Sequence, residues 1–312
     1  IALRYRLGAG GIQGAAAAAR TLKEARGPTA NLEGTDVLDG IRNNIAESLG
    51  ELAQRIEVKQ SWDDLVLPPD TLEAVKGLIA RVRHAHQVYE KWGFKSKMPR
   101  GIGVAALFSG PPGTGKTMVA GLLARELELE LYQVDLSKVV SKWVGETEKQ
   151  LAKIFAAAEA GHALLLFDEA DSLFAKRTEV KSAVDRYANL EVNYLLQRIE
   201  SFGGVTILTT NLDTSIDPAL RRRLASHIVF QSPEEAEGAQ LWKRMLTIGA
   251  PITEPLGFDK LARAFPAMVG ANIRNAVLAA AFMAASEGVP ISHNHLERAA
   301  RGEYRAMGRA LG

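Results

Sequence analysis

The chain of 312 residues contains no cysteine. Disulfide bonds, thiolate catalysis and cysteine-ligated zinc sites are therefore excluded. Neither sign of charge dominates, because 38 lysine and arginine residues stand against 36 aspartate and glutamate residues, a formal net charge of +2. A balance of this kind gives no support for an acidic partner, so we expect neither nucleic-acid binding nor membrane insertion.

Long hydrophobic runs are also missing. The longest lies near 162–167 and is far too short to span a bilayer. No signal peptide is visible, and a chain without cysteine suits a reducing compartment, so the expected location is the cytoplasm. The chain begins at Ile1 rather than at a methionine, which suggests a piece of a longer protein.

Three segments follow from the pattern of apolar residues. Residues 1–58 are rich in alanine, leucine, arginine and glutamate, which predicts helices. Residues 59–234 alternate short apolar runs with amphipathic stretches, which predicts an α/β domain with a parallel five-stranded sheet and helices on both faces. Residues 235–312 carry no strand signals and predict an all-α domain. The expected strands are 104–108, 131–134, 163–167, 205–209 and 228–230.

A faint internal repeat relates the two ends of the chain. The stretch ALRYRLGAGGIQGAAAAA from Ala2 can be laid over ARAFPAMVGANIRNAVLAA from Ala262, with one extra residue in the second copy. Two interpretations remain open. The match is chance similarity between alanine-rich helices, or residues 1–58 are the end of a preceding, similar module.

Residues 110–117 read GPPGTGKT and match the phosphate-binding motif G-x-x-x-x-G-K-[ST] in full. The motif follows a predicted strand and opens a predicted helix, where its glycines and the helix N-terminus can cradle phosphate oxygens. Lys116 supplies a charge to the β- and γ-phosphates, and Thr117 offers a hydroxyl to Mg²⁺. The expected cofactors are therefore ATP or ADP and Mg²⁺. The predicted nucleotide contacts of this loop are Gly110, Pro111, Pro112, Gly113, Thr114, Gly115, Lys116, Thr117 and Met118.

Two carboxylates follow the apolar run 163–167, at the sheet edge where parallel α/β folds bind ligands. Asp168 is expected to hold Mg²⁺, directly or through water. Glu169 is expected to orient and deprotonate the attacking water. Asn211 ends the next predicted strand and either hydrogen-bonds the γ-phosphate or that water, or simply forms a turn.

Together these motifs resemble the AAA subgroup of the AAA+ ATPases, from about Trp62 to Leu311. The resemblance implies a P-loop α/β domain followed by an α-helical lid, so that residues 1–58 would be the lid remnant of an earlier AAA+ module. It also implies a homo-oligomeric ring, expected to be a hexamer. Such a ring would hydrolyse ATP to remodel, unfold or thread a protein substrate, with or without an adaptor. The alternatives are a nucleotide-dependent assembly switch with little turnover, or a motor acting on nucleic acid.

The resemblance extends to residues that would act between subunits. The run DPALRRR at 217–223 is similar to the segment that supplies arginine fingers, with Arg222 and Arg223 as candidates. Related proteins often carry Pro/Phe-Gly between two arginines, whereas this chain has an unbroken run, so Arg221 is also open. A central pore loop that would grip the substrate is implied at Lys142, Trp143, Val144 and Gly145.

Further nucleotide contacts are implied at two other places. Gly270 and Ala271 resemble the start of the sensor-2 helix, and Arg274 either touches the γ-phosphate or is a surface arginine. Asp64 and Leu65 lie where the family's connector packs on adenine. The runs IDPALRRRLASHIVF and GANIRNAVLAAAF are most similar to those of bacterial ATPases found with contractile injection systems.

Overall fold

A computed structural model describes residues 9–27, 29–97, 103–139, 146–171, 193–211, 224–247 and 249–309. The chain forms two compact units built from discontinuous segments. The first unit comprises Ile1–Lys59, Lys76–Phe108 and Ala120–Ile228. The second comprises Gln60–Val75, Ser109–Val119 and Val229–Gly312. The phosphate-binding motif and the C-terminal helices therefore belong to the same unit.

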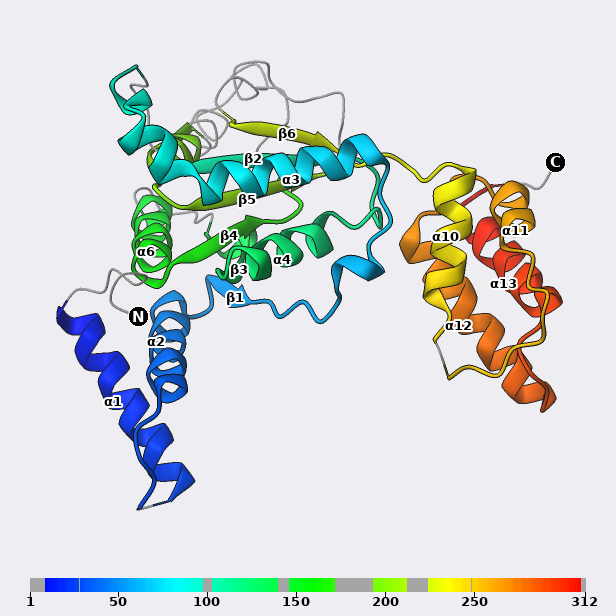
Figure 1. The fold of residues 1–312 in the computed structure, drawn as a ribbon, viewed down its shortest axis with the longest axis horizontal. Helices are drawn as coiled ribbons and strands as arrows, with labels where there is room; N and C mark the ends of the chain where they lie inside the picture. Colours follow the sequence, from blue (N-terminus) through cyan, green and yellow to red (C-terminus); the bar gives the residue numbers. More distant parts are fainter. Residues whose placement is uncertain are drawn as a thin grey trace. The chain divides into compact units, whose positions relative to one another are not determined.

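The strands form one six-stranded sheet in the order β1-β3-β4-β5-β2-β6 (Figure 1). Strands β3, β4 and β5 pair in parallel. Residue numbers increase in the same direction along β2 and β6. Ala225 N–H donates to Ala105 O, and Phe230 N–H donates to Ser109 O. The predicted α/β fold is confirmed. The strands are β1 (Ala53–Arg55), β2 (Val104–Ser109), β3 (Glu130–Val134), β4 (Ala163–Phe167), β5 (Val205–Thr210) and β6 (Ser226–Val229).

Strand β1 was not expected, because the composition of residues 1–58 predicts helix throughout. Helix α1 (Ala9–Arg26) and helix α2 (Gly34–Leu49) agree with that prediction. Helix α2 ends at Gly50, whose φ of 54° suits glycine, and β1 then pairs antiparallel with β3. Arg55 Nε also donates to Glu130 Oε2 at 2.7 Å. The prediction was wrong here because pairing with a strand distant in sequence outweighs local propensity.

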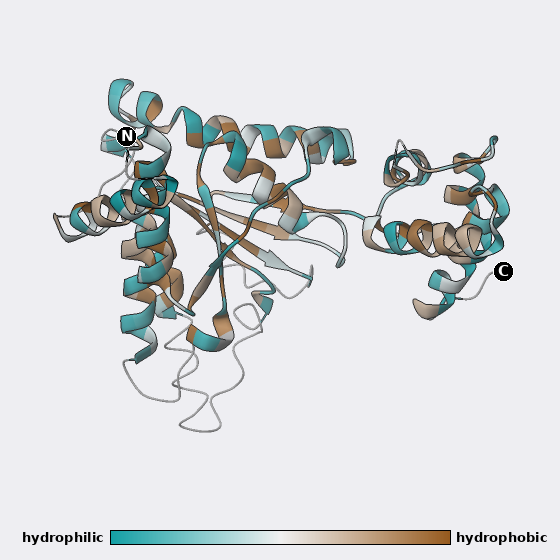
Figure 2. Cartoon of the chain, turned by 90° about the horizontal axis from the view of Figure 1, so that it is seen from below, coloured by the Kyte–Doolittle hydropathy of each residue, from teal (hydrophilic) through white to brown (hydrophobic). Residues whose placement is uncertain are grey.

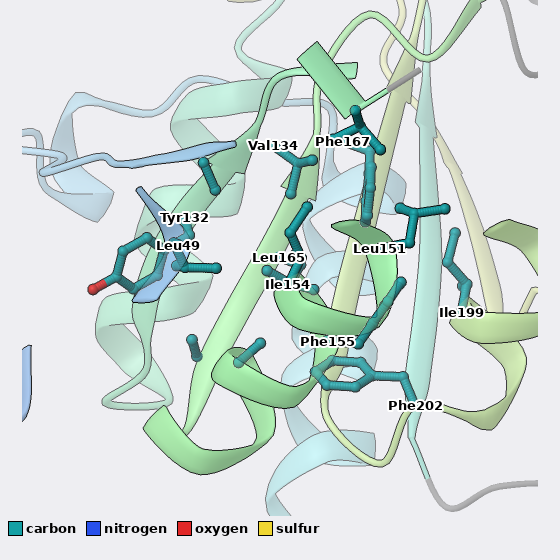
Figure 3. Packing of buried hydrophobic residues seen from close by; sticks show 14 of the residues in the cluster. Leu49, Tyr132, Val134, Leu151, Ile154, Phe155, Leu165, Phe167, Ile199 and Phe202 are labelled. Carbon is teal, nitrogen blue, oxygen red and sulfur yellow. The ribbon is translucent and has the colours of Figure 1, made fainter. Parts of the chain in front are cut away.

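The main core lies on one face of the sheet, under α2, helix α6 (Glu146–Gly161) and a helix at 193–201. Figure 3 shows Phe155, Phe167 and Phe202 in this cluster, with Phe155 and Phe202 edge to face at 5.2 Å between ring centroids. Every residue of β4 is buried, as predicted for a central strand covered on both faces. In Figure 2 several strands of the sheet are brown, that is hydrophobic, along much of their length, whereas the helices carry both teal and brown residues.

The N-terminal helices are part of this first unit. Ile41, Ile45 and Leu49 of α2 are buried in the main core. Helices α1 and α2 pack closely, since a Cβ built on Gly40 would lie 2.4 Å from the Ala15 carbonyl oxygen. Helices α1 and α2 therefore share a hydrophobic core with the sheet.

Further helices among the described residues before the lid connect these strands, and α4 begins at Lys116, within the phosphate-binding motif. They are η1 (Trp62–Asp64), α3 (Pro69–Arg83), η2 (Gln87–Lys91), η3 (Phe94–Lys97), α4 (Lys116–Glu126) and α5 (Leu136–Val139).

Four helices form the C-terminal lid, as predicted, around a core that includes the fully buried Trp242. They are α10 (Glu235–Met245), α11 (Phe258–Ala264), α12 (Gly270–Glu287) and α13 (His293–Ala306). Within the described ranges, no helix has both the length and the apolar character that crossing a membrane requires.

Candidate nucleotide site

The phosphate-binding loop has the geometry that its sequence predicts. Gly110, Gly113 and Gly115 all have positive φ, of 137°, 78° and 97°. A Cβ on Gly110 would lie 2.0 Å from the Phe230 carbonyl oxygen, so that position has no space for a side chain. Lys116 is buried, and its Nζ donates to the Gly110 carbonyl at 2.7 Å and to the Pro111 carbonyl at 2.9 Å. The loop therefore wraps closely around its lysine ammonium group.

The start of α12 contacts this loop within the second unit. Ala271 N–H donates to the Gly113 carbonyl at 3.4 Å, and a Cβ on Gly113 would lie 2.7 Å from Ala271 Cβ. The predicted contacts Gly270 and Ala271 are thus brought to the phosphate-binding loop. Arg274, one turn further along α12, is exposed, which leaves both of its predicted roles open.

The connector at 61–65 lies in the same unit. The Asp64 carboxylate accepts hydrogen bonds from the Ser61 backbone N–H at 2.7 Å and from the Ser61 hydroxyl at 2.9 Å, so it caps the turn η1. Leu65 Cδ1 would lie 3.9 Å from a Cβ built on Gly115. Arg244 of α10 donates to the carbonyl oxygens of Asp63 and Leu65, the latter at 2.9 Å. Leu65 therefore lies beside the loop, while the Asp64 side chain is engaged within the connector.

In the first unit, neighbouring strands hold the carboxylate of Asp168 and the backbone of Glu169, the two residues that follow β4. Thr209 Oγ1 donates to Asp168 Oδ1 at 2.5 Å from β5, and Gln133 Nε2 donates to Asp168 Oδ2 at 3.1 Å from β3. Glu169 is exposed and has a φ of 51°, and its N–H donates to Thr209 Oγ1 at 3.0 Å. Both Asp168 oxygens and the Glu169 backbone therefore have fixed hydrogen-bond partners.

Asn211 is positioned by a second carboxylate. Its backbone N–H donates to Asp171 Oδ1 at 3.1 Å, and the same oxygen accepts a hydrogen bond from the Thr210 hydroxyl. The end of β5 is therefore tied to the chain that follows β4 at two successive residues.

Sequence reasoning missed Gln133, Asp171, Thr209 and Arg244. Gln133 and Thr209 are polar residues within strands and Asp171 lies four residues after β4, a pattern that does not by itself identify their partners. Arg244 has no readable signal, since it acts on the connector from a helix far along the chain. The predicted arginine fingers Arg222 and Arg223, the alternative Arg221 and the predicted pore loop 142–145 lie outside the described residues.

The side chains present suit a magnesium nucleotide. The loop has glycine where its turns need positive φ and a buried ammonium group beside them, which is the chemistry that phosphate oxygens require. The Thr117 hydroxyl and the Asp168 carboxylate are hard oxygen donors of the type that Mg²⁺ prefers.

Comparison with known proteins points to one family. Residues 106–232 match the family model described as "ATPase family associated with various cellular activities (AAA)". An uncharacterized AAA family ATPase of Sinorhizobium fredii is 36% identical over 194 residues, which cover 61% of this chain and 56% of that protein. The 26S proteasome regulatory subunit 8 of Caenorhabditis elegans is 28% identical over 232 residues, 71% of this chain and 56% of that protein. The chain thus spans little more than half the length of these relatives.

A solved structure shows the same fold. The crystal structure of the FIGL-1 AAA domain superposes with a TM-score of 0.64 at 20% identity, covering 86% of this chain and 96% of that one. The matched segment 106–232 contains the phosphate-binding loop, Asp168, Glu169 and Asn211. On these grounds residues 106–232 belong to the AAA family of ATPases.

Proposed function

We propose that this chain binds ATP with Mg²⁺ and hydrolyses it to ADP and phosphate. The observation that carries the proposal is the phosphate-binding loop, whose glycines have positive φ around the buried Lys116. A Gly-rich turn without a ligand would not need a buried ammonium group within 2.9 Å of its own carbonyl oxygens.

Each group has a distinct role in the proposed reaction. Lys116 and the loop N–H groups bind the phosphates, and Thr117 and Asp168 hold the magnesium ion, which neutralises phosphate charge. Glu169 accepts the proton of the attacking water, and Asn211 orients that water or the γ-phosphate. In this proposal the loop and the carboxylates that follow β4 serve one nucleotide.

A more specific proposal concerns what the hydrolysis of ATP drives. We infer a ring of identical copies, a hexamer, that remodels, unfolds or threads a protein substrate, with Arg222 and Arg223 acting on the neighbouring copy's nucleotide. A relative named as a proteasome subunit supports a protein substrate, and the formal net charge of +2 disfavours nucleic acid. Association with contractile injection systems rests on the quoted sequence runs alone.

The substitution Glu169→Gln tests the chemistry. It keeps the size and hydrogen-bonding shape of the side chain but removes the base, so steady-state turnover should fall about 100-fold or more. Binding of ATP, measured by calorimetry, should be retained because the phosphates are held by the loop. Wild-type turnover in this variant would show that Glu169 is not the base.

The control is Glu159→Gln, the same change on the exposed part of α6. It should leave turnover within about twofold of the wild type, since exposed substitutions away from a site change little.

A further inference from the structure

The hydroxyl of Thr209 lies between the two carboxylate residues of the proposed site. Thr209 is 1% exposed at the end of β5. Its Oγ1 donates to Asp168 Oδ1 at 2.5 Å and accepts from the Glu169 backbone N–H at 3.0 Å. Its backbone carbonyl also accepts from Ala170 N–H at 2.8 Å. One buried residue therefore contacts three successive residues after β4.

The backbone of Glu169 needs such support. Its φ of 51° lies in the left-handed region, which costs free energy for any residue other than glycine. Conformations of this kind persist only where the surrounding structure holds them. Two hydrogen bonds hold this part of the chain: Glu169 N–H donates to Thr209 Oγ1, and Ala170 N–H donates to the Thr209 carbonyl oxygen.

We infer that Thr209 is a positioning residue for the hydrolysis step, and that its hydroxyl aligns the magnesium-binding carboxylate of Asp168 with the base Glu169. The hydroxyl can do both because it is a donor and an acceptor at once. Gln133, by comparison, donates to the other oxygen of Asp168. The inference rests on the proposed function, in which these two carboxylates act on one magnesium nucleotide.

The test compares Thr209→Val with Thr209→Ser. Valine keeps the branched shape and removes the hydroxyl, while serine keeps the hydroxyl and loses a methyl group. We expect Thr209→Val to lower kcat about 10- to 100-fold, the effect of losing one hydrogen bond to a charged group, with KM changed by less than about threefold. Thr209→Ser should restore kcat to within about threefold of the wild type.

A second readout does not depend on turnover. Calorimetry with ADP in the presence and absence of Mg²⁺ gives the gain in affinity that the metal provides. We expect ADP affinity without Mg²⁺ to be unchanged in Thr209→Val, because the phosphate-binding loop is intact. The gain from Mg²⁺ should shrink about tenfold, because the Asp168 carboxylate is no longer held.

Thr206→Val is the matched control. Thr206 lies on the same strand, is also 1% exposed, and its hydroxyl has no hydrogen-bond partner among the residues that the structure describes. The same substitution there should leave kcat and the magnesium effect within about twofold of the wild type. If Thr209→Val fails to fold by circular dichroism, Thr209→Ala against Thr209→Ser isolates the hydroxyl in the same way.

Three outcomes would overturn the inference. They are an unchanged kcat and magnesium effect in Thr209→Val, a failure of serine to restore them, and an equal loss in Thr206→Val. These results are distinct from failure of the proposed function, which would appear as full turnover in Glu169→Gln. In that case the magnesium measurement still decides whether Thr209 holds Asp168.

Discussion

At position 113 the backbone and the surrounding atoms both require glycine. Its φ is 78°, and a Cβ would lie 2.7 Å from Ala271 Cβ and 2.9 Å from Val269 Cγ2. Real side chains do not approach so closely, so a larger residue has to displace the start of α12 or distort the loop. The phosphate-binding loop therefore approaches the start of α12 this closely only because residue 113 has no side chain.

Gly113→Ala should weaken ADP binding about tenfold or more. Alanine in the left-handed region costs about 1–2 kcal/mol, and the clash with Ala271 adds to this. Calorimetry measures the effect. The control is Gly302→Ala in α13, where a Cβ meets nothing within 4 Å. It should keep full affinity and stabilise the protein by about 0.5–1 kcal/mol. Equal affinities in the two variants would contradict this account of Gly113.

Residues of the site differ in how readily sequence reveals them. The loop around Lys116 could be predicted because its chemistry is contiguous and each residue type has a stated role. Thr209 and Gln133 could not, because their partner Asp168 lies 35 or more positions away in the chain. A threonine or glutamine in a strand cannot be recognised as part of a site from sequence, because only the folded sheet brings its side chain beside a carboxylate.

At the scale of elements, hydrophobic periodicity predicted the strands of the parallel sheet because each is a short apolar run. It failed at β1, whose residues Ala53–Arg55 are not apolar and form a strand only against β3. Edge strands of this kind depend on partners that a local pattern does not contain.

The junction of α12 and α13 is held by one carboxylate. Glu287 accepts from His295 Nε2 at 2.9 Å and from Arg298 Nη1 at 3.0 Å. The hydrogen bond from His295, followed by that from Arg298, lowers the pKa of Glu287 below its ordinary value. A carboxyl group with a lowered pKa in the folded state stabilises the protein above its unfolded pKa, about 4.3, and loses that contribution as the pH falls through the folded value.

We therefore expect the thermal unfolding temperature to fall as the pH drops below about 4.3, with a smaller fall in Glu287→Gln. Because the carboxylate is near the surface, the difference between the two proteins should also shrink at high salt. Calorimetric melting curves from pH 3 to pH 7 measure it. The half-buried Glu297, which pairs with Arg301 four residues on at 2.6 Å, provides the control Glu297→Gln. Parallel pH profiles for wild type and Glu287→Gln would refute the role given to Glu287.

At the scale of the whole molecule, the compact units do not follow the chain in order. The phosphate-binding loop and the connector group with the lid, and the N-terminal helices group with the sheet. Boundaries at 58 and 234 were predicted from composition and remain a prediction. Sequence cannot show such grouping, since it depends on which discontinuous segments pack together. The lid contact of Gly113 gives the grouping a physical basis, because a loop that binds phosphate is joined there to α12.

The central claim is that the loop around Lys116 binds a nucleotide for hydrolysis. The most direct test is calorimetric titration of the wild type and of Lys116→Ala with a slowly hydrolysed ATP analogue and Mg²⁺. We predict saturable binding of one nucleotide per chain in the wild type and no measurable binding in Lys116→Ala, whose circular dichroism should match that of the wild type. Undiminished affinity in Lys116→Ala, or no binding by the wild type, would contradict the account.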